Sequence, residues 1–482
     1  MIQLQRASGV LLHISSLYGD YSSGSFGQAA LEFVDFLVDC GFSYWQVLPF
    51  CVTEECNSPY KSYGAFSGNP FFVDLPTLYR EGLLTREELE SARQKTPYYC
   101  EFDVLQTSRM KLLQKAQARF TDWDALDAFF VKNPHIAAFC RFMALKKANN
   151  GAALSERTVD VPDEEEVRLW RFVQYEFFKQ WQVIKDYAND KGVKIIGDIP
   201  IYVSLDSSDV EENKSDFQVG EDYAPSSVAG VPPDYFSEDG QLWGNPLYDW
   251  EHMEQNGFSW WCDRLAFENM LFDGVRIDHF RGIESYYSIP ATETTAKNGK
   301  WIKGPGMKLV KVIQELCRDK LVIAEDLGDI TPAVYELLQE SGLPGMRVLQ
   351  FAFLGDNDSP HRPHNYVNNC VAYTGTHDNN TLLGYVWELD DATRKELLEY
   401  FGYTGENWDA CYDSILRAMF ASSAGLLILP IQDLLLYGSD TRFNKPGTTE
   451  DNWNYRITKE QLLSIDKKKF RRWNQLYARL PK

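Results

Sequence analysis

The most constraining feature of this sequence is a repeated local pattern, in which a helix-like stretch ends at a glycine and a short apolar run follows. Residues 29–40 carry apolar side chains at helical spacing and stop at Gly41, before the run that starts at Tyr44. Thr331 and Pro332 suit the start of a helix, and Gly342 ends it. Because the apolar runs are continuous rather than alternating, they predict parallel strands that are covered on both faces.

Eight such runs occur along the chain. They begin at Gly9, Tyr44, Val193, Gly274, Leu321, Met346, Val371 and Leu426. Eight parallel strands alternating with helices are the number found in a (β/α)8 TIM barrel. A doubly wound open sheet is the competing fold, because short runs are easily miscounted. We predict the barrel, and therefore an α/β chain whose residues 1–482 form a single catalytic domain.

The spacing of the runs predicts two insertions. A βα unit takes about 30 residues in a barrel of about 250, but the gap between the second and third runs is several times longer. We predict an inserted helical subdomain over residues 51–192. Residues 202–271 are rich in Pro, Gly, Asp and aromatic side chains, and we predict a loop-rich subdomain there, over the active-site cleft.

Charge and cysteine content narrow the choice of partners and compartment. The formal net charge is -21, which disfavours nucleic acid and anionic membrane surfaces as partners. The nine cysteines include one close pair, Cys51 and Cys56, so we expect reduced thiols rather than a disulfide framework or a zinc knuckle. Residues 1–6 do not resemble a secretory signal, and no apolar stretch reaches the length of a membrane span. We expect a cytoplasmic protein.

Four of the predicted strands lead into acidic residues: Asp198, Asp278, Glu325 and Asp378. The C-terminal ends of barrel strands meet at one mouth, where catalytic groups lie, and crowded acids raise one another's pKa. Arg276 precedes Asp278 by two residues, so on a strand it faces the same way and would keep Asp278 ionised. Glu325 follows an apolar run, a setting that raises the pKa of a carboxyl group towards the range of a proton donor.

Two chemistries fit these acids. One is retaining glycoside cleavage, in which one carboxylate attacks the anomeric carbon and a second carboxyl group carries the proton. The other is metal-assisted hydrolysis, with ligands drawn from the pairs at residues 278–279, 325–326 and 377–378. The chain has only seven histidines, and the immediate neighbour of Asp278, His279, is expected to point away from the mouth. Spacing favours sugar chemistry and leaves the metal alternative open.

Residues 274–282 (GVRIDHFRG) resemble the nucleophile segment of 4-α-glucanotransferases, also called amylomaltases or disproportionating enzymes. Residues 323–328 are similar to their acid/base segment, and residues 374–379 resemble the segment that bears the third catalytic carboxylate of the α-amylase clan. Further matches follow in order at residues 8–13, 58–60, 68–70, 197–200, 241–246, 304–306, 432–434 and 444–447. So many ordered matches are more specific than one short motif.

The resemblance implies a role for each matched residue. Asp278 would form the covalent glucosyl-enzyme, Glu325 would act as general acid and then base, and Asp378 would favour the transition state. Substrate-binding roles are implied for Ser58, Tyr60, Asp198, Trp243, Asn245, Arg276 and His377, with Trp243 as a stacking ring. Residues 230–236 match a loop that covers the cleft in this family. The family needs no cofactor or metal and lacks the C-terminal β-sandwich of many amylases.

The expected function is retaining transfer of a 1,4-α-D-glucan segment to the 4-hydroxyl of an acceptor glucan or glucose. The expected partners are maltooligosaccharides, starch or glycogen fragments, and glucose. The alternatives are a hydrolase or phosphorolytic enzyme of the same clan, and a glucan-binding scaffold with an inactive site. Residues 210–213 and 452–456 depart from the family pattern, and these departures leave acceptor preference and glucan length open.

Overall fold

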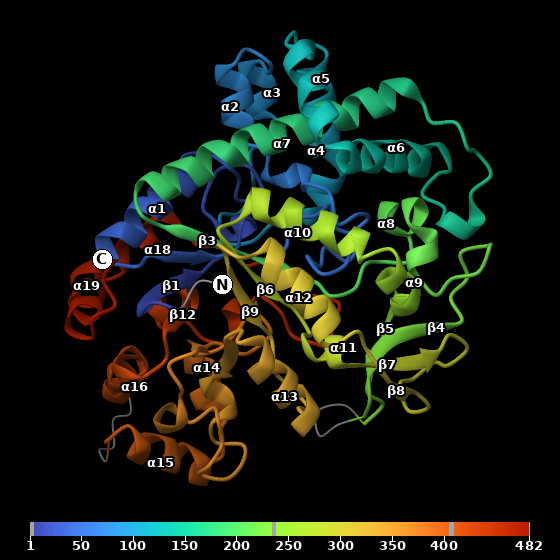
Figure 1. Cartoon of the computed structure of the whole chain (residues 1–482). Helices are drawn as coiled ribbons and strands as arrows, with labels where there is room; N and C mark the ends of the chain where they lie inside the picture. The colour runs from blue at the N-terminus through green and yellow to red at the C-terminus, as the bar shows by residue number, and fades with distance from the viewer. Residues whose placement is uncertain (1–3, 234–237, 404–408, 482) are drawn as a thin grey trace.

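The computed structural model describes residues 4–233, 238–403 and 409–481, and its centre is a closed barrel of eight parallel strands (Figure 1). The predicted (β/α)8 barrel is therefore confirmed, and the open sheet is excluded. Going round the barrel, the strands are β1 (Ala7–Leu11), β12 (Leu426–Pro430), β11 (Cys370–Tyr373), β10 (Gly345–Val348), β9 (Leu321–Ala324), β6 (Gly274–Ile277), β3 (Lys194–Ile199) and β2 (Tyr44–Gln46).

Helices cover the outside of the barrel and connect most of its strands. They are α1 (Gln28–Cys40), α7 (Glu164–Asp190), α10 (Ser259–Leu271), α12 (Met307–Leu316), α13 (Pro332–Ser341), α14 (Leu382–Glu388), α15 (Asp391–Tyr400) and α16 (Asp409–Ala421). One connection differs from regular alternation. Residues 349–369, all of which are described, contain two short 3-10 helices, η5 (Leu349–Phe351) and η6 (Pro363–Asn365), and no α-helix.

Two helix ends are set by glycine, as predicted. Gly41 follows α1 with φ 78°, and Gly342 follows α13 with φ 65°. Both values lie in the left-handed region that glycine adopts without a steric penalty. Thr331 and Pro332 occupy the N-cap and first position of α13.

Between β2 and β3 the chain forms a group of helices that stands beside the barrel at the top of Figure 1. They are α2 (Leu75–Arg80), α3 (Arg86–Glu90), α4 (Phe102–Gln117), α5 (Trp123–Lys132) and α6 (Pro134–Ala148). The 27-residue α7 packs against α4, α5 and α6 and also against α1 and β3. Because α7 packs against both the inserted helices and the barrel, the boundary of the inserted subdomain at residue 192 stays a prediction.

A second sheet, which the sequence analysis did not predict, lies beside the barrel (Figure 1). It is antiparallel, with the order β5 (Gln241–Pro246), β4 (Ser227–Val231), β7 (Ser285–Pro290) and β8 (Lys300–Lys303). Two of its strands, together with α8 (Ser208–Glu212), α9 (Trp250–Gln255) and α10, fall within residues 202–271. This stretch therefore holds regular structure as well as loops, and its extent as a subdomain stays a prediction.

The end of the chain is helical. After β12 come α17 (Ile431–Leu435), α18 (Lys459–Ser464) and α19 (Lys467–Leu476), and the described residues 431–481 contain no strand. Helix α19 packs against α1 and so returns the chain to the start of the barrel (Figure 1). None of the helices in the described ranges is both long and apolar enough to cross a membrane.

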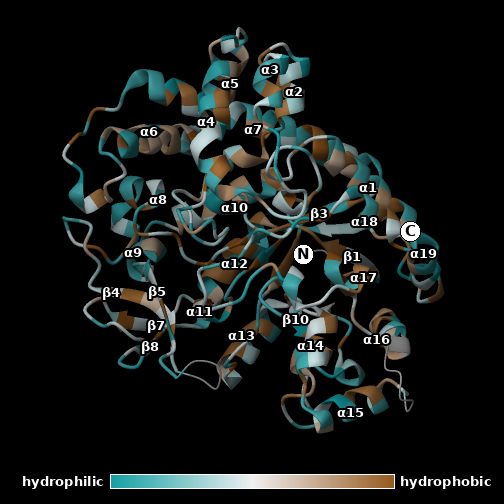
Figure 2. Cartoon of the chain, turned by 180° about the vertical axis from the view of Figure 1, so that it is seen from behind, coloured by the Kyte–Doolittle hydropathy of each residue, from teal (hydrophilic) through white to brown (hydrophobic). Residues whose placement is uncertain are grey.

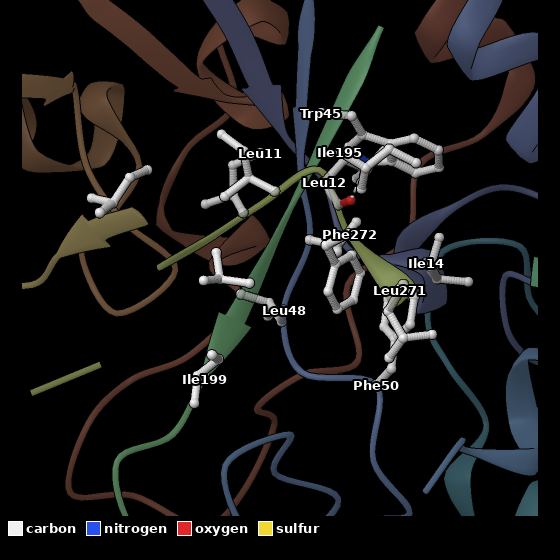
Figure 3. Packing of buried hydrophobic residues seen from close by; sticks show 14 of the residues in the cluster. Leu11, Leu12, Ile14, Trp45, Leu48, Phe50, Ile195, Ile199, Leu271 and Phe272 are labelled. Carbon is white, nitrogen blue, oxygen red and sulfur yellow. Dashed lines mark hydrogen bonds between the residues drawn. The ribbon is translucent and has the colours of Figure 1, made fainter. Parts of the chain in front are cut away.

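Hydrophobic residues gather in the central strands, whereas the outer helices carry hydrophilic stretches (Figure 2). Figure 3 shows Trp45 and Ile195 packed together in this core, with Phe272 close to β3. A Cβ atom on Gly197 would lie 2.2 Å from Phe272 Cδ2, so a residue without a side chain is required there. This close packing fixes the position of β3 at the residue that precedes Asp198.

Candidate active site

The four predicted acids lie at the same end of the barrel. Asp198 is in the last part of β3, Asp278 directly follows β6, and Glu325 directly follows β9. Asp378 lies in the loop after β11. Because the four strands are parallel within one closed barrel, their C-terminal ends open on one mouth.

Arg276 lies at the centre of this cluster. It pairs in register with Asp198 across β3 and β6, and its Nη1 lies 2.8 and 2.9 Å from the two carboxylate oxygens of Asp198. Its Nη2 lies 2.8 Å from Asp278 Oδ1. Arg276 and Asp198 are 3% and 1% exposed, so this ion pair is shielded from water. The predicted facing of Arg276 and Asp278 is confirmed, and the guanidinium holds both carboxylates in place.

Glu325 is buried beside Asp278, and its two oxygens are held by the backbone. Oε2 accepts a hydrogen bond from His279 N at 2.6 Å, and Oε1 accepts one from Leu327 N at 2.7 Å. Burial raises the pKa of Glu325 to about 7, with Arg276 opposing this shift and the charge of Asp278 adding to it. The expected rise in the pKa of Glu325 is confirmed, and the group can donate a proton near neutral pH.

Asp378 is stabilised in its ionised form, in contrast to Glu325, whose protonated form is favoured. Its Oδ2 lies 3.2 Å from His377 Nε2, and its Oδ1 accepts a hydrogen bond from Asn444 Nδ2 at 2.7 Å. Burial opposes ionisation, but His377 and Asn444 lower the pKa of Asp378 to about 2. Burial lowers the pKa of the His377 imidazole, but the charge of Asp378 outweighs this effect and the pKa is raised. Asp378 is therefore an anion throughout the neutral range.

Tyr60 connects the two sides of the mouth. Its hydroxyl donates to Asp198 Oδ2 at 2.8 Å, and its ring stacks on His377 with centroids 5.0 Å apart. Ser58 Oγ accepts a hydrogen bond from Tyr60 N at 3.3 Å and thereby shapes the turn that carries the ring. The structure thus brings Tyr60, Asp198 and His377 together, although they are far apart in the sequence.

Trp243 reaches the same region from the second sheet. Its ring meets His279 edge to face, with centroids 4.9 Å apart and an angle of 85°. Asn245 is differently placed: its Nδ2 donates to Val203 O at 2.8 Å, and the residue is 9% exposed. Its amide therefore anchors β5 to the loop after β3. In the predicted cleft-covering loop, Gly230 and Val231 belong to β4, and residues 234–236 lie outside the described residues.

Three residues near the acids had no role in the sequence analysis. Asn444 bonds to Asp378, as described above, and Arg442 Nη2 donates to Asp378 O at 3.0 Å. The Trp453 ring lies 6.0 Å from His377 and 5.9 Å from Tyr60. The match at residues 444–447 was the available signal for Asn444, but only the fold shows which carboxylate it contacts.

One of the residues considered as metal ligands, Asp326, has other partners, whereas the buried Nε2 of His279 has no hydrogen-bond partner among the described atoms. Asp326 accepts a hydrogen bond from Met346 N at 2.6 Å and pairs with Arg347 at 2.9 Å. Within the described ranges, no group of three or more His, Cys, Asp or Glu residues is arranged to hold a metal ion.

Comparison with known proteins identifies close relatives over nearly the whole chain. The family model described as 4-alpha-glucanotransferase matches residues 12–462. A 4-alpha-glucanotransferase of Clostridium butyricum is 43% identical, over 97% of this chain and 100% of its own length. One from Thermus thermophilus is 39% identical over 96% of both chains. The structure of amylomaltase from Streptococcus agalactiae in complex with acarbose is 36% identical with a TM-score of 0.94, and the match covers 99% of this chain and 100% of that chain.

Proposed function

Because the chain belongs to the family of 4-alpha-glucanotransferases, we infer that it transfers segments of 1,4-α-glucans to the 4-hydroxyl of an acceptor glucan or glucose. The observation that carries the mechanism is the pairing of Glu325, whose pKa is about 7, with the Asp278 carboxylate beside Arg276. One carboxyl group can give a proton while the other attacks, which are the two roles that retaining transfer requires. The acarbose complex of the Streptococcus agalactiae relative supports a carbohydrate substrate.

In the first step, we propose that an Asp278 oxygen attacks C1 of a glucose unit in the donor. The bond from C1 to the glycosidic oxygen breaks, and Glu325 gives its proton to that oxygen. The reducing-end part of the donor leaves with a new 4-hydroxyl, and the remaining segment stays bound as an ester of Asp278. Attack from the opposite face inverts C1.

In the second step, the 4-hydroxyl of an acceptor attacks C1 of the ester. The Glu325 carboxylate takes the hydroxyl proton, the bond from C1 to Asp278 breaks, and Asp278 returns to its free form. The second inversion restores the α configuration, and Glu325 is again protonated for the next cycle.

The other acids bind rather than react. We propose that Asp378, kept anionic by His377, accepts hydrogen bonds from sugar hydroxyls and stabilises the positive charge that develops at C1. Tyr60 would cover one face of the reacting sugar, and Asp198 would act mainly by fixing Arg276 and Tyr60. Trp243 offers a ring for stacking against an acceptor sugar. Ser58 and Asn245 would contribute by shaping the loops around the sugar.

The nine cysteines all lie in the described part of the chain, and all are free thiols. This supports the proposal that the protein works in the cytoplasm, where thiols stay reduced. We propose maltooligosaccharides, fragments of starch or glycogen, and glucose as its partners there.

Incubation of the purified protein with maltotriose tests this function. We expect glucose and a ladder of longer maltooligosaccharides, with the total number of reducing ends unchanged. Reducing ends that increase without a ladder would identify a hydrolase, and sugar phosphates formed only in the presence of phosphate would identify a phosphorolytic enzyme. No reaction would leave a binding scaffold. Loss of transfer on treatment with EDTA would contradict the metal-free mechanism.

A further inference from the structure

A short helix after the nucleophile contacts the loop after the acid/base. Helix α11 (Arg281–Glu284) begins three residues beyond Asp278, and Arg281 is 3% exposed. Arg281 Nη1 donates to the backbone oxygen of Asp329, and it lies 3.7 Å from the Asp329 carboxylate. Asp329 follows Glu325 by four residues. Arg281 therefore connects the segments that carry the two reacting carboxyl groups.

The loop between Glu325 and Asp329 has a direct part in holding the acid. Leu327 N donates to Glu325 Oε1, and Gly328 has φ 89°, a left-handed turn. The near end of this loop is anchored by Asp326, which pairs with Arg347 and accepts from Met346 N. Arg281 anchors the far end. The position of the Leu327 N–H group thus depends on both anchors.

The second sheet holds Arg281 in place. The Arg281 Cζ atom lies 3.7 Å from the centroid of the Trp301 ring on β8, a distance at which a guanidinium is attracted to an aromatic face. Gly304 N donates to Glu284 O at 2.7 Å, and Gly306 N donates to Ile283 O at 2.8 Å. These two bonds fix the chain at the end of β8, the strand that carries Trp301, to α11.

The remaining contacts of Arg281 are few. Its Nη2 donates to Ser285 Oγ at a long 3.4 Å, and its buried Nε has no hydrogen-bond partner among the described atoms. Burying a charged group is unfavourable unless it is well paired. Because the burial of Arg281 contributes little to stability, its contacts are better explained by a role in positioning its neighbours.

We propose that Arg281, held by Trp301, is a positioning residue that fixes the loop at residues 326–329 and thereby keeps Glu325 aligned with Asp278. This inference rests on the proposed function, because alignment of a proton donor matters only if Glu325 transfers a proton. It also gives the second sheet a role in catalysis, because Trp301 is one of its residues.

Two consequences follow for a variant that loosens the loop. A misplaced acid lowers the rate of the chemical step more than it weakens substrate binding. Loss of the Leu327 N–H group from Glu325 also removes a donor that favours the carboxylate form. The pKa of Glu325 then rises, and the fall in activity at high pH moves to higher pH.

The test is Arg281→Lys, because lysine keeps the charge but lacks the planar fork of the guanidinium. With maltotriose, we expect kcat to fall about tenfold to a hundredfold with little change in KM, and the basic limb of kcat/KM to move upward by about one pH unit. The matched control is Arg362→Lys. Arg362 is 5% exposed, lies 4.9 Å from the Phe353 ring and bonds to Glu396 and Ala352 O, but it is outside the site.

Variants of Trp301 keep the test decisive if Arg281→Lys folds poorly. Trp301→Ala should shift kcat and the basic limb in the same direction, and Trp301→Phe should restore both. The positioning role would be overturned if the basic limb of kcat/KM did not move. It would also be overturned if the loss of activity in Arg281→Lys matched its unfolded fraction and equalled the loss in Arg362→Lys. Absence of transfer by the wild-type protein would instead show that the proposed function is wrong, and the positioning role would fall with it.

Discussion

At the scale of single residues, the proposed acid/base role makes Glu325 the group that sets the pH range of the reaction. Its pKa is raised to about 7, first by burial. The proposed first step needs this group protonated, so kcat/KM should fall about tenfold per pH unit above about pH 7. The pH profile of glucose release from maltotriose measures this. A basic limb that persists in Glu325→Gln, in whatever activity remains, would show that another group is titrating.

The raised pKa of Glu325 also affects stability. The folded state binds this proton more tightly than the unfolded state, so stability is lost as the pH rises from about 4.3 to about 7. Glu325→Gln removes the titrating group and should raise the melting temperature, relative to wild type, more at pH 8 than at pH 5. Melting curves at the two pH values provide the check, and an equal difference at both would contradict the raised pKa.

Asn444 offers a prediction about the third acid. Its Nδ2 donates to Asp378 Oδ1 at 2.7 Å, so Asn444→Ala should leave this carboxylate less well oriented and lower kcat about tenfold. Asn369→Ala is the matched control, because Asn369 Nδ2 bonds to Gly342 O where β10 and β11 begin, at the end of the barrel opposite the mouth. Steady-state kinetics with maltotriose compare the two. Equal rates for both variants would rule out a role of Asn444 in the reaction.

At the scale of elements, β3 depends on a residue without a side chain. A Cβ atom at position 197 would lie 2.2 Å from Phe272 Cδ2, so Gly197→Ala should force β3 and Phe272 apart and cost about 1–3 kcal/mol of stability. Gly355→Ala is the control, because a Cβ atom there would have no neighbour within 4 Å. Denaturant unfolding measures both variants. A Gly197→Ala protein as stable as the control would mean that the core at Phe272 yields easily.

The barrel could be predicted from the sequence because its strands are buried on both faces. Residues such as those of β9 and β12 form continuous apolar runs, and no polar face interrupts the signal. The second sheet gave no such signal. Strand β8 has four residues with a lysine at each end, and β5 contains Gly, Asn and Pro, which are depleted in strands. Its order also depends on pairing between distant segments.

The acids could be predicted because strand ends converge in any barrel, whereas their partners could not. Tyr60 and Asp198 are 138 positions apart, and Asn444 is 66 positions from Asp378. No local pattern reports such contacts, because the intervening chain folds into other elements. The raised pKa of Glu325 was predictable from its apolar strand, but the two backbone donors that bind it depend on the turns after β6 and β9.

At the scale of the whole molecule, the site is assembled from segments that are far apart in the chain. The barrel supplies Asp198, Arg276, Asp278 and Glu325, the segment after β2 supplies Tyr60, and the second sheet supplies Trp243 and Trp301. The loop after β12 adds Asn444 and Trp453. We therefore expect transfer activity and the folded barrel to be lost together on heating, rather than activity failing first through one detached subdomain.

The central claim is that Asp278 carries the sugar between the two steps. The most direct measurement is mass spectrometry of Glu325→Gln after incubation with α-maltosyl fluoride. Fluoride leaves with little help from an acid, whereas the second step lacks its base, so a maltosyl ester should accumulate. After digestion, the account predicts the added mass on the peptide that contains Asp278. An adduct on a peptide without Asp278, or β-configured products without any adduct, would contradict it.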